Sequence, residues 1–250
     1  YIIPPKSTII GAIAMANSTR NGMHLEYFYD KNKEEDIYSN AYRYKDCIEY
    51  VAYGYEYKPI NFMGLTKMYL SLYNTRTNRT VEEMYRIRTG PLHVGMASYY
   101  NGLLKVFLVI GNKGECKITL DKKDLYSITR LGSKESVVSV VEVQDPKRNK
   151  IEIEKISKEK RRIYDIKFSF PKDMKGININ SIIGSYFIEN VIEDEEGITY
   201  SFSEPLKTDR LIIKTYIVPN PTVSVTTTGD ESLCLFKTPE GNIIAPGELC

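Results

Sequence analysis

The chain has 250 residues, of which 42% are hydrophobic and 26% charged, and its formal net charge is +2 at pH 7. These are the values of an ordinary globular protein, and they exclude a globally basic nucleic-acid binder. The longest apolar run, residues 103–110, is interrupted by Lys105 and has the length of a strand, so a transmembrane helix is not expected.

The four cysteines lie far apart, none is part of a C-x-x-C pair, and the chain has two histidines. A structural zinc site is therefore not expected, and we predict a reducing, cytoplasmic location. Ala14-Met15-Ala16 matches a signal-peptidase site, but the apolar segment is short and prolines replace the basic n-region. Abundant Lys and Glu with a single Gln is a thermophile tendency.

The first predicted element is a helix over about residues 9–16, with Ser7 or Thr8 as its N-cap and Pro4-Pro5 as a turn before it. We call residues 4–8 the elbow. The polar segment 29–40 is predicted as loop. The stretch 45–58, rich in Tyr, Val and Ile, is predicted as a strand.

Residues 58–105 follow with seven basic residues and two glutamates, a net charge of +5. Residues 80–83 have capping-box spacing, whereas residues 85–90 alternate like a hairpin arm, so helix and hairpin both stay open. Residues 186–206, in contrast, carry acidic residues and no basic one. Such clusters also occur as solvated faces of ordinary proteins.

A strand is predicted over residues 104–110 and a helix over residues 121–132, with Asp121 as its cap and Gly132 at its C-terminal end. Another strand is predicted over residues 136–143. Beyond a boundary near Pro146, short strands are predicted over residues 151–156, 163–170, 198–202, 211–218 and 222–228.

The order of elements in residues 1–145 is that of a ferredoxin-like β-α-β-β-α-β unit except for its opening strand, which would precede Tyr1. The predicted fold class is therefore α+β. A ferredoxin-like domain (residues 1–145) with an insertion at about residues 58–102 would be followed by a β-rich domain (residues 146–250).

Sequence signatures of hydrolases, P-loop enzymes, zinc proteases and dinucleotide-binding enzymes are missing from the sequence. Two segments suit anions instead. Lys6, Ser7 and Thr8 precede or begin a helix, where free N–H groups and the helix dipole favour negative charge. A glycine-containing loop offers cationic and hydroxyl donors for phosphate or ribose, from Arg130, Gly132, Ser133, Lys134 and Ser136.

The basic insertion adds arginines among tyrosines, and both side chains can stack on splayed RNA bases. Its candidate RNA-binding residues are Arg76, Arg79, Arg86 and Arg88. Simple helix capping and an ordinary glycine turn remain alternatives for the elbow and the loop. The three segments together favour RNA.

Residues 4–14 (PPKSTIIGAIA) and 128–143 (ITRLGSKESVVSVVEV) resemble the proline-rich turn with first helix, and the glycine-containing loop with following strand, of the CRISPR-associated family-five proteins. The archaeal subtype I-A form is the most similar. The resemblance implies an RRM-like domain with a protruding thumb, and a subunit of a Cascade-like antiviral complex that binds the 5′ handle of CRISPR RNA. Its partners would be the backbone subunit (family seven), the large subunit and, through the complex, target DNA. It implies no cofactor, metal or catalytic residue.

Two other functions stay open. One is a metal-independent endoribonuclease that processes precursor CRISPR RNA, with His93 as acid/base among Tyr85, Arg88, Tyr99 and Tyr100. One branch of the family cleaves precursor RNA in this way. The other is a β-rich adaptor without an RNA role.

Overall fold

The computed structural model describes residues 3–22, 27–29, 37–56, 60–68, 92–99, 102–111, 120–132, 137–145, 150–158, 161–194 and 211–250. The fold is mixed α+β and mostly sheet, which agrees with the predicted class. In the described part of the chain, no helix has the length and apolar character needed to cross a membrane.

The core of the N-terminal half is one pair of antiparallel strands with two helices on one face. Strand β3 (Ile48–Tyr55) pairs with β6 (Leu104–Ile110), and both strands agree with the sequence prediction. Helix α1 (Lys6–Arg20) and the short helix α3 (Lys122–Tyr126) contact each other beside them. Helix α1 begins three residues earlier and ends four residues later than predicted.

Short elements connect α1 to β3. Strand β1 (Tyr27–Tyr29) pairs antiparallel with β2 (Ile37–Ser39), and a 3-10 helix, η1 (Asn40–Tyr44), follows. The prediction of loop for residues 29–40 was therefore wrong at Tyr29, which ends β1, and at residues 37–40, which form β2 and the start of η1. Tyrosine and isoleucine at these positions favour a strand more than their acidic neighbours oppose it.

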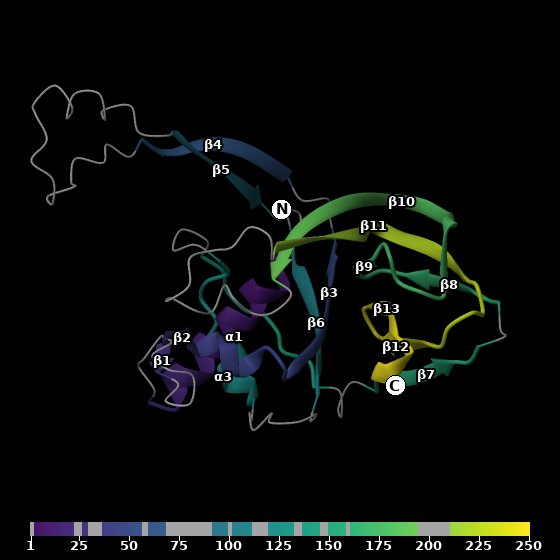
Figure 1. The fold of residues 1–250 in the computed structure, drawn as a ribbon, viewed down its shortest axis with the longest axis horizontal. Coiled ribbons are helices and arrows are strands. Elements are labelled where there is room, and N and C mark those ends of the chain that lie inside the picture. Colours follow the sequence, from purple (N-terminus) through teal and green to yellow (C-terminus); the bar gives the residue numbers. More distant parts are fainter. Residues whose placement is uncertain are drawn as a thin grey trace, which may run out of the picture.

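The inserted segment begins and ends as a β-hairpin that projects from the body of the molecule (Figure 1). Strands β4 (Ile60–Met68) and β5 (Leu92–Tyr99) pair antiparallel and place Lys67 opposite His93. Residues 80–90, for which helix and hairpin stayed open, lie outside the described residues.

The C-terminal half is a seven-stranded sheet of order β10-β11-β8-β13-β12-β7, with β9 paired to β11. Its strands are β7 (Glu152–Ile156), β8 (Ile163–Ile166), β9 (Phe170–Pro171), β10 (Ile177–Asp194), β11 (Leu211–Thr227), β12 (Leu233–Thr238) and β13 (Gly241–Pro246), followed by the 3-10 helix η4 (Gly247–Leu249). The long hairpin β10–β11 curves over the rest of the sheet (Figure 1).

Three strand predictions needed correction. Residues 211–218 and 222–228 form the single strand β11, because Pro219 and Pro221 lie within the strand without ending it. Residues 163–170 divide into β8 and the start of β9. The strand predicted over residues 136–143 does not form in its described part: Arg130 and Val137 make one isolated bridge, and the N–H groups of Val138 and Val143 donate to the Thr129 carbonyl and the Tyr126 hydroxyl. The predicted strand over 198–202 and the boundary near Pro146 lie outside the described residues.

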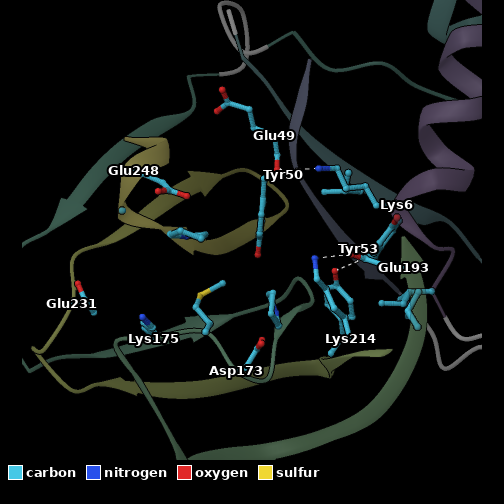
Figure 2. Close-up of a pocket in the computed structure, with 18 of the residues that line it drawn as sticks. Lys6, Glu49, Tyr50, Tyr53, Asp173, Lys175, Glu193, Lys214, Glu231 and Glu248 are labelled. Carbon is cyan, nitrogen blue, oxygen red and sulfur yellow. Dashed lines mark hydrogen bonds and ion pairs between the residues drawn. The ribbon is translucent and has the colours of Figure 1, made fainter. Parts of the chain in front are cut away.

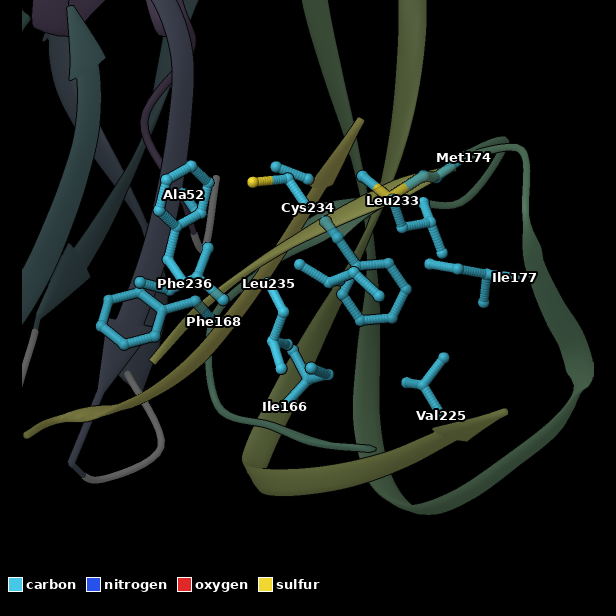
Figure 3. Packing of buried hydrophobic residues seen from close by; sticks show 14 of the residues in the cluster. Ala52, Ile166, Phe168, Met174, Ile177, Val225, Leu233, Cys234, Leu235 and Phe236 are labelled. Carbon is cyan, nitrogen blue, oxygen red and sulfur yellow. The ribbon is translucent and has the colours of Figure 1, made fainter. Parts of the chain in front are cut away.

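Strand β3 is buried on both faces because it lies between the helices and the C-terminal sheet. On one face, Val51 and Tyr53 pack with Ile9 and Ile13 of α1. On the other face, Tyr50 and Ala52 join the core of the C-terminal sheet, part of which is shown in Figure 3. That core includes Ile166, Phe168, Phe170, Val225, Leu233, Leu235 and Phe236.

Polar contacts also join the two halves. The Tyr50 hydroxyl donates to the Ile244 carbonyl at 2.9 Å, and the Ser169 N–H donates to the Tyr53 carbonyl at 2.7 Å. At the far end of β6, Lys105 pairs with Glu240.

All cysteines in the described ranges form disulfides. Cys234 in β12 is bonded to Cys250, with the two Cα atoms 5.5 Å apart, and Cys47 is also disulfide-bonded. Sequence spacing had given no reason to expect these bonds, because the fold and not the spacing brings Cys234 and Cys250 together.

Candidate nucleic-acid interface

The elbow turns directly into α1, without a side-chain cap. Pro5 is the N-cap, with φ −55° and ψ 148°, and its carbonyl accepts hydrogen bonds from the N–H groups of Thr8 at 3.0 Å and Ile9 at 3.4 Å. The prediction that Ser7 or Thr8 caps the helix was wrong, because both lie inside its first turn. Two prolines fix φ near the value a helix needs, so the helix starts immediately after them.

The first turn of α1 has no acidic residue of its own, and the carboxylates that act on its first residue, Lys6, come from Glu193, Asp46 and Glu49. No cap side chain accepts the N–H groups of this turn. Among the described residues, nothing accepts from the N–H of Lys6 or Ser7. These N–H groups, which have no acceptor among the described residues, and the dipole of a 15-residue helix together favour an anion at this end.

The loop after α3 returns to the elbow. Helix α3 ends at Tyr126 with Ser127 as its C-cap, so the predicted helix to Gly132 was too long. Gly132 lies instead in a separate bend at φ +92°, next to Arg130. A β carbon built on Gly132 would lie 3.8 Å from Cγ2 of Thr8. The structure thus brings together two predicted segments that are far apart in the sequence.

A buried polar network fixes α3, and with it this loop, against α1. The Asp124 side chain is fully buried and accepts from Asn17 Nδ2 at 2.9 Å. Asp124 also pairs with Arg20, and the Tyr44 hydroxyl donates to Asn17 Oδ1 at 2.7 Å. Charge-assisted contacts of this kind are strong and directional, so they fix the position of α3 on α1.

Lys6 does not share a site with Thr8. Two residues along an α-helix are about 200° apart around its axis, so their side chains point to opposite sides. The Lys6 ammonium donates to the Glu49 carbonyl at 3.3 Å and lines a cavity between β3 and the C-terminal sheet. Burial lowers the pKa of Lys6, an effect that the Glu193 carboxylate opposes.

That cavity has a volume of about 570 Å³ and contains a connected polar cluster (Figure 2). The Glu193 carboxylate accepts from the Tyr216 hydroxyl at 2.7 Å and pairs with Lys214 at 2.8 Å. Burial and the nearby Glu193 carboxylate both raise the pKa of Tyr216. Sequence reasoning missed this cluster, because its members come from β10 and β11, which are joined by a long connection.

The remaining predicted residues are not brought to the elbow by any described contact. Ser133, Lys134, Ser136, Arg76, Arg79, Arg86 and Arg88 lie outside the described residues. His93 lies in β5, and no group of three or more potential metal ligands occurs in the described part of the chain.

Comparison with family models, curated proteins and solved structures gave no match. A proposal on function therefore rests on the two motifs and on the geometry that joins them.

Proposed function

We propose that the chain is a non-catalytic RNA-binding subunit of a type I-A Cascade-like CRISPR complex, in which the elbow and the Gly132 loop bind the 5′ handle of the guide RNA. The backbone and large subunits are its proposed neighbours. The proposal rests on the resemblance of the two segments to the family-five proteins.

The observation that carries the proposal is the proximity of Thr8 to Gly132, where a β carbon built on the glycine would lie 3.8 Å from Thr8 Cγ2. It places the N-terminus of α1 near a glycine at positive φ, and the exposed Arg130 lies two residues before that glycine in the chain. Main-chain N–H groups and a guanidinium are the donors that proteins use to fix a phosphate backbone. The shared site consists of Ser7, Thr8, Arg130 and Gly132, whereas Lys6 belongs to the cavity.

The fold supports a ferredoxin-like N-terminal unit, and we propose one. Helix α1, strands β3 and β6 and helix α3 follow in the order of that fold, and both helices pack on one face of the strand pair. The hairpin β4–β5 lies between the two strands in sequence, as a thumb would.

A charge placed in the first turn of α1 tests the proposal, because it acts in opposite directions on stability and on binding. Ser7→Glu adds a carboxylate where the dipole favours it, so the helix gains about 0.3–1 kcal/mol. The same carboxylate occupies the place of an RNA phosphate and repels it. We expect the variant to unfold at higher denaturant concentration while its affinity for handle RNA, measured with the backbone subunit present, falls at least tenfold.

Ser7→Gln is the matched control, since it has similar size and no charge, and we expect its affinity to change little. Scrambled RNA of equal length measures specificity. The logarithm of the binding constant should fall by about 0.7 per phosphate contact for each log unit of salt concentration. Equal affinity of the native protein for handle and scrambled RNA would reject the proposal. So would unchanged affinity in Ser7→Glu.

The endoribonuclease alternative has less support. His93 and Tyr99 both lie in β5, six residues apart. Six residues of a strand span about 20 Å, so the strand does not bring the two positions together around one phosphodiester. Incubation of precursor RNA with the protein in EDTA tests this alternative. A discrete cut that His93→Ala abolishes would favour the enzyme.

A further inference from the structure

A second strongly basic segment follows the first half of the chain. Residues 147–162 contain eight lysines and arginines against three glutamates, a net charge of +5, so the rest of the chain has a net charge of −3. The segment ends in the run Lys158-Glu159-Lys160-Arg161-Arg162. Short runs rich in Lys and Arg are typical of nucleic-acid-binding surfaces.

The fold gathers the described part of this segment around one turn of the C-terminal sheet. Lys155 lies in β7, the edge strand, opposite Cys234 at the start of β12. The connection from β7 to β8 then runs along the turn between β11 and β12. There Lys158 pairs with Glu231 at 3.1 Å, and Arg161 Nε donates to the Thr228 carbonyl at 3.2 Å.

These cations are accessible. Lys155, Lys158, Arg161 and Arg162 are all exposed. Two of them form ion pairs, Lys158 with Glu231 and Arg162 with Glu154. The Lys158 side chain is 60% exposed and the Arg162 side chain is 53% exposed. Exposed pairs of this kind contribute little to stability and exchange readily for other anions. Within the described ranges, no carboxylate pairs with Lys155 or Arg161.

We propose that Lys155, Lys158, Arg161 and Arg162, here called the basic edge, form a contact surface for the phosphate backbone of duplex nucleic acid. Binding of splayed single strands normally uses aromatic side chains on which bases stack. The basic edge offers cations, two of them paired with Glu231 and Glu154, and no stacking group among its four residues; Tyr164, which follows in β8, packs against the hydrophobic core. Cations without stacking groups suit a paired helix, whose phosphates face outward, and imply binding that does not depend on sequence.

The basic edge is separate from the proposed handle site. Figure 1 shows β7 and β8 at the end of the molecule away from α1 and α3. The proposal of duplex binding goes beyond handle binding and does not depend on it, so an experiment can reject either proposal and leave the other standing.

The test is fluorescence anisotropy of the full chain with a labelled 20-base-pair DNA duplex of arbitrary sequence and with each of its single strands. Four phosphate contacts predict that log K falls by about 3.6 per log unit of salt. Lys155→Glu/Lys158→Glu should weaken duplex binding at least tenfold and reduce that slope by about 2, since each lysine accounts for about one phosphate. Handle-RNA affinity, measured in parallel, should change much less.

Lys167→Glu/Lys172→Glu is the charge-matched control, because both lysines are exposed and lie outside the basic edge. Lys155→Gln/Lys158→Gln covers the case in which the reversed charges impair folding, and should weaken binding in the same direction. Three results would overturn the proposal: no duplex binding by the native protein, equal loss in the control, or tighter binding to single strands than to the duplex.

Discussion

The methyl group of Thr8 faces Gly132, since a β carbon built on the glycine would lie 3.8 Å from Thr8 Cγ2. The first turn of α1 is thus close to the loop after α3. The space around Gly132 would admit a β carbon, since 3.8 Å is an ordinary van der Waals separation. Its backbone conformation is the real constraint, because φ +92° disfavours every residue with a side chain.

Gly132→Ala should therefore destabilise the protein by about 1–2 kcal/mol through backbone strain and not through a clash. Gly11 provides the opposite case: it lies within α1, and a β carbon there would meet no atom within 4 Å. Gly11→Ala should stabilise the protein by about 0.5–1 kcal/mol. Urea unfolding of both variants measures the two effects, and equal signs would contradict this explanation.

Asp124→Asn should destabilise the protein by about 2–3 kcal/mol, since it removes the charge from a fully buried carboxylate that accepts from Asn17 and from the Asp121 N–H and pairs with Arg20. Asp121→Asn is the control, because the ion pair between Asp121 and Arg20 is long and exposed. Its N···O distance is 3.5 Å, and the side chains of Asp121 and Arg20 are 46% and 37% exposed. That change should cost less than about 0.5 kcal/mol. Denaturant unfolding distinguishes the two, and a loss in Asp121→Asn as large as in Asp124→Asn would argue against a special role for the network.

The sequence predicted the elements whose partners are adjacent or whose pattern is strong. Strands β3 and β6 were found because each is rich in branched and aromatic residues. The start of α1 was placed too late because capping preference favours Ser7 and Thr8, whereas the fixed φ of Pro5 decides the boundary. Strand β10 was missed, since asparagines, serine and glycine interrupt its apolar residues and only pairing with β11 makes it a strand.

The candidate site was predicted in part. Sequence analysis predicted anion binding by the elbow and by the Gly132 loop as two separate segments, which stays a prediction, and it did not foresee their proximity, which depends on tertiary packing that no local pattern encodes. Lys6 was assigned to the same site as Thr8 because they are neighbours in sequence. Helical geometry separates them, and it directs Lys6 toward Glu193 and Lys214, which come from strands nearly 200 residues away.

The bond between Cys234 and Cys250 closes a loop with a sequence separation of 16 residues. Closure of such a loop stabilises a fold by about 3 kcal/mol, chiefly by restricting the unfolded chain. Cys250→Ala should lower the free energy of unfolding by about this amount, measured with guanidinium without reductant. The variant leaves the Cys47 disulfide intact, which treatment with a thiol would not. An unchanged transition would show that this bond does not form in the purified protein.

Lys6→Met should stabilise the protein at pH 7. The folded protein disfavours the Lys6 ammonium, because burial lowers the pKa of Lys6 below its usual 10.5 despite the opposing Glu193 carboxylate. Below the pKa of Lys6 in the folded protein, the buried ammonium therefore lowers the free energy of unfolding by its full amount. This destabilisation disappears as the pH rises toward 10.5, where Lys6 also loses its proton in the unfolded chain. Removal of a cation from a helix N-terminus alone contributes about 0.3–1 kcal/mol.

The measurement is urea unfolding of native protein and Lys6→Met at a series of pH values from 7 to 10.5. The advantage of the variant should be largest at pH 7 and should shrink as the pH approaches 10.5. The comparison cancels the titration of Tyr216 and of the other lysines, which both proteins share. Lys172→Met, at an exposed position, should show no such trend. An advantage that grows with pH would mean that the charged form of Lys6 is favoured in the fold.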